Sequence, residues 1–243
     1  MQRREVLISM AAVAGTAASV PLLRAATTDG APAASPPARW EAGAANPALP
    51  PRAGGLLFLT ATEAETLGAI ADRLIPADEL SIGGKEAGCV AFIDRQLDGT
   101  FGQGVSDYRR GPYYQGTPEQ GPQNKLTPAQ RYRVGLAALA AYCQREYGKG
   151  FAQLDAATQD QLLTRMEANQ LALGQVDSKP LFELVLQNVR EGFLADPVYG
   201  GNKDMASWKM LGFPGARYDF RDYMDRKGEK FNFIPVSLID SAS

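Results

Sequence analysis

Histidine does not occur anywhere in the 243 residues of this chain. Its imidazole is the side chain that most often serves as a general base near neutral pH, and it is the commonest metal ligand. Its absence excludes Ser-His-Asp and Cys-His catalysis, and also haem or zinc sites that depend on histidine. The two cysteines, Cys89 and Cys143, are too few and too far apart for a local iron–sulfur or zinc motif.

An excess of charge is also lacking, because 25 basic residues are balanced by 27 acidic ones and the formal net charge is −2. A chain with this charge balance lacks the excess of basic residues that attracts nucleic acid or anionic lipid. No Gly-x-Gly-x-x-Gly follows a predicted strand, so the dinucleotide-binding pattern is missing as well. We therefore predict no catalytic, cofactor-binding or metal-binding residue in this chain, and no nucleic-acid partner.

Four carboxylates, Glu191, Asp196, Asp204 and Asp219, gather in one region of the sequence. Paired carboxylates can perform acid–base chemistry or bind calcium. Their spacing matches no known calcium loop, however, and an aspartate before a proline, as in Asp196-Pro197, typically caps a turn with its own side chain. We interpret Asp196 as a turn residue.

Helix signals dominate the sequence from Leu56 onward. Thr60 with Glu63, and Thr127 with Gln130, form capping boxes at helix starts. Apolar residues then recur at helical spacing, and no convincing run of alternating strands is found. The sequence predicts a mostly α protein with a single irregular helical domain and long ordered loops. We expect helices from Thr60 to Ile75, from about Glu86 to Leu97, from Thr127 to Tyr147, from Asp155 to Leu173, from Ser178 onward, over Met205–Leu211 and over Tyr218–Arg226, followed by an extended tail from Phe231 to Leu238.

The first residues resemble a targeting segment. Arg3 and Arg4 stand directly before an apolar stretch, Val6 to Leu23, that is diluted by small residues. Twin arginines followed by such a stretch are typical of a Tat export signal, and we assign residues 1–26 to it. A Sec signal or a membrane anchor is the alternative. Tat carries folded proteins, often with a bound cofactor, so a chain without a cofactor motif suggests a partner that has one.

Two further segments are rich in proline and glycine. Residues 27–55 form a linker or extended arm before the domain at 56–243, and Trp40 within it is either an anchor or an incidental aromatic. Residues 99–125 form a long loop that contains Tyr113 and Tyr114. Such a loop is either an interface or a solvated insertion, and its tyrosines favour an interface slightly.

The most distinctive stretch runs from residue 193 to residue 215. Asp196-Pro197 and Gly212-Phe-Pro-Gly215 are turn signals, and Gly200-Gly201-Asn202 is a run of residues that tolerate positive φ. Large aromatic side chains stand on this non-repetitive backbone. The stretch is either a surface loop that aromatics brace internally or a binding surface. The candidate interface residues in and around it are Tyr199, Asn202, Trp208, Phe213 and Tyr218.

The residues Asp196-Pro-x-Tyr-Gly-Gly-Asn202, followed by Trp208-x-x-x-Gly-x-Pro-Gly215, resemble the signature of the gluconate 2-dehydrogenase subunit 3 family. The resemblance extends in order over about Leu56 to Ile234. These proteins are small accessory subunits of bacterial flavin-dependent sugar and sugar-acid dehydrogenases. The resemblance implies an FAD-containing GMC-type catalytic partner, with a cytochrome c subunit as a further candidate. It also implies that this chain supplies the export signal for the flavoprotein.

We accordingly expect a non-catalytic subunit in the periplasm, held at the inner membrane, if at all, only through its partners. A stand-alone exported enzyme and a periplasmic binding or structural protein are the alternatives. The two cysteines leave three possibilities open. Export permits a disulfide, and a Cys89–Cys143 bridge between the second and third predicted helices is our preferred prediction. Two buried thiols, or a bridge to a partner, are the others.

Overall fold

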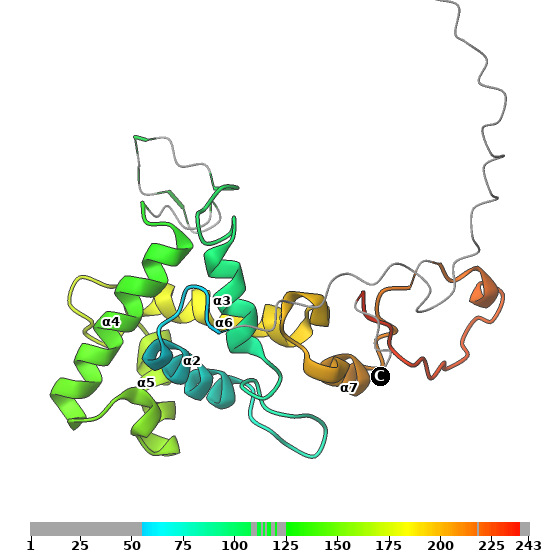
Figure 1. Ribbon diagram of the computed structural model, residues 1–243, viewed down its shortest axis with the longest axis horizontal. Coiled ribbons are helices and arrows are strands. Elements are labelled where there is room, and N and C mark those ends of the chain that lie inside the picture. Colours follow the sequence, from blue (N-terminus) through cyan, green and yellow to red (C-terminus); the bar gives the residue numbers. More distant parts are fainter. Residues whose placement is uncertain are drawn as a thin grey trace, which may run out of the picture. The chain divides into compact units, whose positions relative to one another are not determined.

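The computed structural model describes residues 55–107, 111–112, 114, 116–117, 120, 125–217 and 219–238. Within them the chain forms α-helices and short 3₁₀ turns and no named strand, which confirms the mostly α prediction (Figure 1). The predicted signal segment with Arg3 and Arg4, the arm up to residue 54, Tyr113 and Tyr218 lie outside the described residues. The α-helices are α2 (Ala61–Leu74), α3 (Cys89–Asp98), α4 (Pro128–Tyr147), α5 (Ala156–Glu167), α6 (Ser178–Leu194) and α7 (Ala206–Leu211), and the 3₁₀ turns are η2 (Phe151–Gln153), η3 (Pro197–Tyr199), η4 (Lys203–Met205) and η5 (Arg221–Tyr223).

Helix α6 is the element around which the others pack. It contacts α3, α5, α4 and α2, and α2 in turn packs against α3 and α5. Close approach depends on glycine at two places: a Cβ on Gly135 of α4 would lie 2.4 Å from a methyl carbon of Leu181, and one on Gly192 would lie 3.0 Å from the Phe92 ring. The largest side chains that are fully buried in this core are Tyr132, Phe151, Leu67, Ile93, Leu97, Leu139, Leu162, Met166 and Val189.

Local signals placed most helix ends correctly. Thr60 and Thr127 both form complete capping boxes, and Gly148 ends α4 in the left-handed conformation. Helix α3 begins at Cys89 because Gly88, at φ 83°, turns the chain just before it. Helix α5 ends at Glu167, six residues before the predicted end at Leu173. The chain turns there because Asn169 adopts a positive φ of 55°.

The predicted helix over residues 218–226 is wrong for most of its described length. Only the short 3₁₀ turn η5 forms there. The side chains of this region instead stack on one another: the rings of Phe231 and Phe233 lie 5.5 Å apart, and Tyr223 meets both edge-on. Aromatic packing without a helix explains why a helical reading of the sequence failed here.

The preferred disulfide is not formed, because Cys89 and Cys143 are both free and buried. The Cys89 thiol lies 3.5 Å from the carbonyl oxygen of Val189 on α6 and donates a hydrogen bond to it. Burial raises the pKa of Cys89 to about 12 and that of Cys143 to about 11. Both therefore stay protonated at neutral pH and act as small apolar groups in the core.

No helix within the described residues combines the length and the apolar character that a membrane span requires.

Candidate partner-binding surface

The loop that follows α6 begins at Asp196, whose carboxylate holds three groups at once. Its Oδ1 accepts hydrogen bonds from the Val198 amide at 2.9 Å and from the Ser237 hydroxyl at 2.7 Å. Its Oδ2 accepts from the Leu238 amide at 2.9 Å. The first bond is the predicted turn cap; the other two fasten the C-terminal tail to the loop. Asp196 is thus a structural residue, as its position before proline indicated.

The double glycine after η3 lets the loop lie directly on two helices. A Cβ on Gly201 would lie 2.0 Å from the Gly192 carbonyl oxygen of α6, and one on Gly88 before α3 would lie 2.7 Å from the Gly200 carbonyl oxygen. The Lys203 amide then donates to the Ala87 carbonyl oxygen at 3.0 Å. Because these contacts join backbone to backbone, the loop has one position relative to α3 and α6.

Replacing Gly201 with alanine is expected to lower the free energy of unfolding by about 2–3 kcal/mol, because the added methyl group meets backbone that cannot move aside easily. Chemical denaturation measures this loss. Gly150→Ala is the matched control, since Gly150 has a φ of −72° and a Cβ added there would lie 4.0 Å from the nearest atom, the Gln153 Oε1. Equal stability of the two variants would contradict the close packing of the double glycine.

Two of the predicted interface residues brace the loop from inside. Asn202 is fully buried; its side chain donates to the Ala195 carbonyl oxygen at 2.9 Å and accepts from both the amide and the hydroxyl of Ser207. Trp208 is 6% exposed, and its indole N–H donates to the Leu194 carbonyl oxygen at 2.8 Å. For these two residues the structure shows internal bracing, one of the two roles that the sequence left open.

Three other predicted residues stand on the surface. Tyr199 is 50% exposed, Phe213 is 47% exposed and Tyr114 is 74% exposed. The Phe213 ring meets the buried Trp208 ring edge-on at 5.2 Å, which fixes its direction. Further exposed apolar side chains flank Tyr199 and Phe213 in sequence, namely Leu194, Met210 and Leu211. The loop therefore presents apolar groups from a braced backbone, which is a suitable surface for a protein partner.

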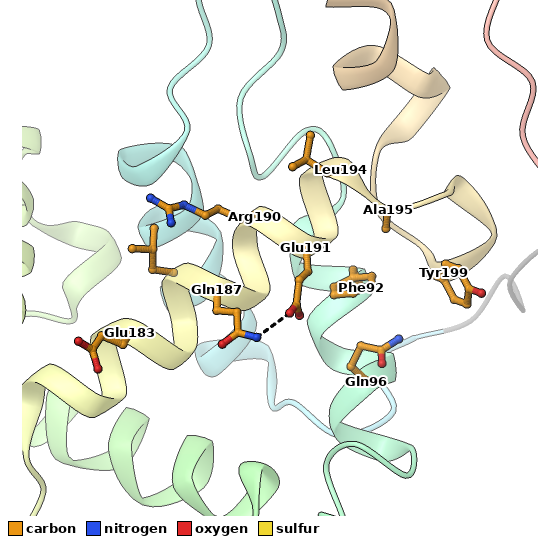
Figure 2. A pocket seen from close by; sticks show the side chains of 10 residues that line it. Phe92, Gln96, Glu183, Gln187, Arg190, Glu191, Leu194, Ala195 and Tyr199 are labelled. Atoms are coloured by element: carbon orange, nitrogen blue, oxygen red, sulfur yellow. Dashed lines mark hydrogen bonds between the residues drawn. The ribbon is translucent and has the colours of Figure 1, made fainter. Parts of the chain in front are cut away.

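A groove that the sequence did not reveal lies beside this loop (Figure 2). It has a volume of about 830 Å³, and it runs along one face of α6 between Glu183 and Leu194. Phe92 and Gln96 of α3 and Tyr199 of the loop complete its lining. Its floor combines apolar groups with the hydrogen-bonded pair of Gln187 and Glu191, whose side chains lie 2.8 Å apart. The sequence can show that residues four positions apart on α6 share a face. It cannot show that Phe92 and Gln96 of α3 lie against that face, because only folding brings the two helices together.

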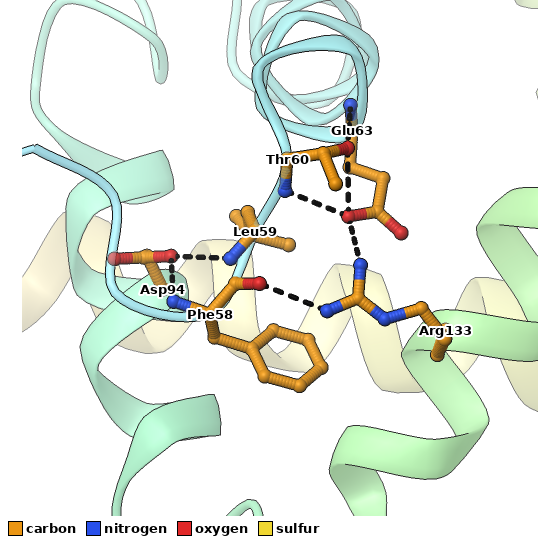
Figure 3. A network of polar contacts seen from close by, with 6 residues as sticks. All are labelled: Phe58, Leu59, Thr60, Glu63, Asp94 and Arg133. Atoms are coloured by element: carbon orange, nitrogen blue, oxygen red, sulfur yellow. Dashed lines mark hydrogen bonds and ion pairs between the residues drawn. The ribbon is translucent and has the colours of Figure 1, made fainter.

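The segment before α2, residues 57–59, is held on α3 by one buried carboxylate (Figure 3). Asp94 accepts hydrogen bonds from three successive amides, those of Leu57, Phe58 and Leu59, at 2.7, 3.0 and 2.8 Å. Arg133 of α4 secures the same segment from the other side. It donates to the Phe58 carbonyl oxygen at 2.8 Å and lies over the Phe58 ring.

Arg133 also pairs with Glu63, the second member of the Thr60 capping box. Partial burial raises the pKa of the Glu63 carboxyl, but hydrogen bonds from the Thr60 amide, Arg133 and the Thr60 hydroxyl outweigh it, so the net pKa is lowered. One polar network thus joins the start of α2, the segment before it and α4. Its position fixes where the N-terminal part of the chain joins the helical domain.

Two of the other carboxylates that the sequence grouped together, Glu191 and Asp219, bind neighbouring side chains. Glu191 accepts from the side chains of Gln187 and Asn188, and Asp219 pairs with Arg221. The hydrogen bond from Arg221 lowers the pKa of Asp219. Within the described residues, no three His, Cys, Asp or Glu side chains are arranged so that they could hold a metal ion.

The helices and the signature loop together match a known protein family. The model of the family described as gluconate 2-dehydrogenase subunit 3 matches residues 61–215, from the first residue of α2 to the last glycine of the loop. The chain belongs to the gluconate 2-dehydrogenase subunit 3 family. No curated protein and no solved structure matches the chain.

Membership confirms the resemblance carried by the residues from Asp196 to Gly215. The family is one of accessory subunits, and membership implies that this chain is a subunit of a gluconate dehydrogenase complex. In this subunit 3 protein the matched range ends at Gly215, where the backbone forms a bridge to Val236. The tail beyond it thus returns to the family's signature loop.

Proposed function

We propose that this chain is the non-catalytic small subunit of a periplasmic, FAD-dependent sugar or sugar-acid dehydrogenase, and that it supports Tat export, folding and stability of the catalytic flavoprotein. The observation that carries the proposal is the family match over residues 61–215. The composition agrees with it, since the chain has neither histidine nor a cofactor motif of its own. The FAD and the oxidation of a CH–OH group belong to a GMC-type catalytic partner.

The exposed side chains of the signature loop are the proposed contact with that partner. Tyr199 and Phe213 present aromatic surface from a backbone that Asn202 and Trp208 hold in place. A preordered loop loses little conformational entropy on binding, so that more of the contact energy appears as affinity. Tyr199→Ala should therefore weaken the complex while it leaves the fold of the small subunit intact.

Export is the second part of the proposal. The Tat system carries folded proteins, so a flavoprotein bound to this chain in the cytoplasm could cross the membrane on the signal at Arg3 and Arg4. Assembly must then precede export. The complex would then act in the periplasm, and its electrons would pass to a cytochrome c subunit or to a quinone.

The test is to express the tagged full-length chain in the cells that encode it and to purify it from the periplasmic and membrane fractions. We expect a larger protein to co-purify with a flavin absorbance spectrum and with dehydrogenase activity toward sugars or sugar acids. In the variant Arg3→Lys/Arg4→Lys, both proteins should remain in the cytoplasm as an assembled pair. Flavoprotein that reaches the periplasm without this chain would remove the export role.

The two alternative functions predict other outcomes of the same purification. A colourless lone chain with activity of its own would be a stand-alone exported enzyme. A colourless and inactive lone chain would be a binding or structural protein. Either result would overturn the proposal.

A further inference from the structure

The groove along α6 has an apolar lining but no occupant in the described part of the chain. Phe92, Leu186, Leu194 and Tyr199 supply apolar or aromatic surface, and the charged side chains of Glu183, Arg190 and Glu191 lie among them. An open groove lined by aromatic groups is the kind of site that receives an extended, proline-rich peptide. The question is which peptide has access to it.

The chain itself supplies such a peptide. Residues 47–51 read Pro-Ala-Leu-Pro-Pro, which contains the spacing Pro-x-x-Pro. Proline-rich segments of this spacing favour the polyproline II conformation, with a rise of about 3.1 Å per residue, so that five residues span about 16 Å. The groove face of α6, from Glu183 to Leu194, is about as long at about 1.5 Å per residue.

The point where the arm joins the domain brings this peptide within reach. Asp94 holds residues 57–59 on α3, the helix whose Phe92 and Gln96 form a wall of the groove. Asp94 lies two residues from Phe92 and two from Gln96 in the sequence. It therefore lies about half a turn around α3 from the wall of the groove. Pro51 stands six positions before Leu57, so the chain from one to the other can extend over about 20 Å, whereas a helix with its side chains is only about 10–12 Å across.

Charge also favours this peptide. Arg52, next to the proline segment, gives residues 47–52 one positive charge. The groove carries two carboxylates, Glu183 and Glu191, and one guanidinium, that of Arg190, so its net charge is negative. Opposite net charges on a peptide and its groove favour their association.

We propose that residues 47–51 dock in the α3–α6 groove of their own chain. The contact would fix the direction in which the N-terminal arm leaves the helical domain, whether or not a flavoprotein is bound. The inference goes beyond the proposed function and does not depend on it.

Disulfide trapping in the full-length chain tests the proposal. Leu49→Cys is combined with Gln187→Cys in the groove, and as a matched control with Asp98→Cys. Asp98 is exposed on α3 one turn from Asp94, on the side where the arm is attached, and it does not line the groove. The native thiols should not interfere, because burial raises the pKa of Cys89 to about 12 and that of Cys143 to about 11.

Under mild oxidation we expect the Gln187 pair to form an intramolecular disulfide about tenfold faster than the Asp98 pair, because docking raises the local concentration of residue 49 in the groove. Tyr199→Ala should slow the Gln187 pair toward the control rate without changing the Asp98 pair. Equal rates, or a faster Asp98 pair, would overturn the proposal. Disulfide-linked dimers of the Gln187 pair, seen by mass, would assign the groove to a second copy and overturn it as well.

Discussion

Replacing Asp94 with alanine is expected to lower the free energy of unfolding by about 3 kcal/mol or more. The carboxylate is 3% exposed and accepts hydrogen bonds from the amides of Leu57, Phe58 and Leu59. Its removal leaves the buried Leu59 amide and the partly buried Phe58 amide without an acceptor, and each shielded donor costs about 1–3 kcal/mol. A shift of the urea midpoint with an unchanged m-value would measure the loss.

Asp155→Ala is the matched control for this variant. Asp155 is an exposed carboxylate that caps α5 through the Thr158 amide, so its loss should cost clearly less than the loss of Asp94. Asp94→Asn keeps one carbonyl acceptor and should fall between the two. If Asp94→Ala were no more harmful than Asp155→Ala, the segment before α2 would not depend on the buried carboxylate.

Replacing Trp208 with alanine is expected to cost about 3–5 kcal/mol, the usual range for removing a buried aromatic side chain. The ring is 6% exposed, it supports Phe213 edge-on, and its N–H holds the Leu194 carbonyl at the end of α6. The variant should therefore lose the fixed geometry of the whole loop, with faster hydrogen exchange at the Phe213 amide, which is bonded to the Trp208 carbonyl.

Trp208→Phe separates the hydrogen bond from the packing. It keeps most of the apolar volume, loses the bond to Leu194 and should cost about 1–3 kcal/mol. Tyr199→Ala serves as the surface control, because it should weaken partner binding with little effect on unfolding. A Trp208→Ala chain as stable as the original would show that the loop does not rest on this side chain.

This expectation for Trp208 differs from what the sequence alone favoured. An aromatic residue among glycines and prolines looks the same in sequence whether it faces a partner or the core. Whether Trp208 is buried or exposed depends on α6, because its indole N–H donates to the Leu194 carbonyl oxygen, 14 positions earlier in the sequence. Asn202 is a similar case, because the positive φ predicted for it is correct, while its burial depends on Ala195 and Ser207.

Features set by a few neighbouring residues could be predicted, and features set by distant pairing could not. The capping boxes at Thr60 and Thr127 and the turn cap at Asp196 each involve residues two or three positions apart. The groove requires α3 and α6 to meet, and the free state of Cys89 depends on Val189, 100 positions away. No local pattern carries that information.

The hydrogen bonds from Ser237 and Leu238 to Asp196 join residues 41 and 42 positions apart, and this separation sets an order of events during synthesis. A ribosome makes the residues of α2 to α6 well before it makes the tail, so the helical core can form while the signature loop still lacks two of its three bonds to Asp196. The loop becomes complete only after residue 238 has left the ribosome. A partner that binds the finished loop would therefore bind only after the tail up to residue 238 has been made.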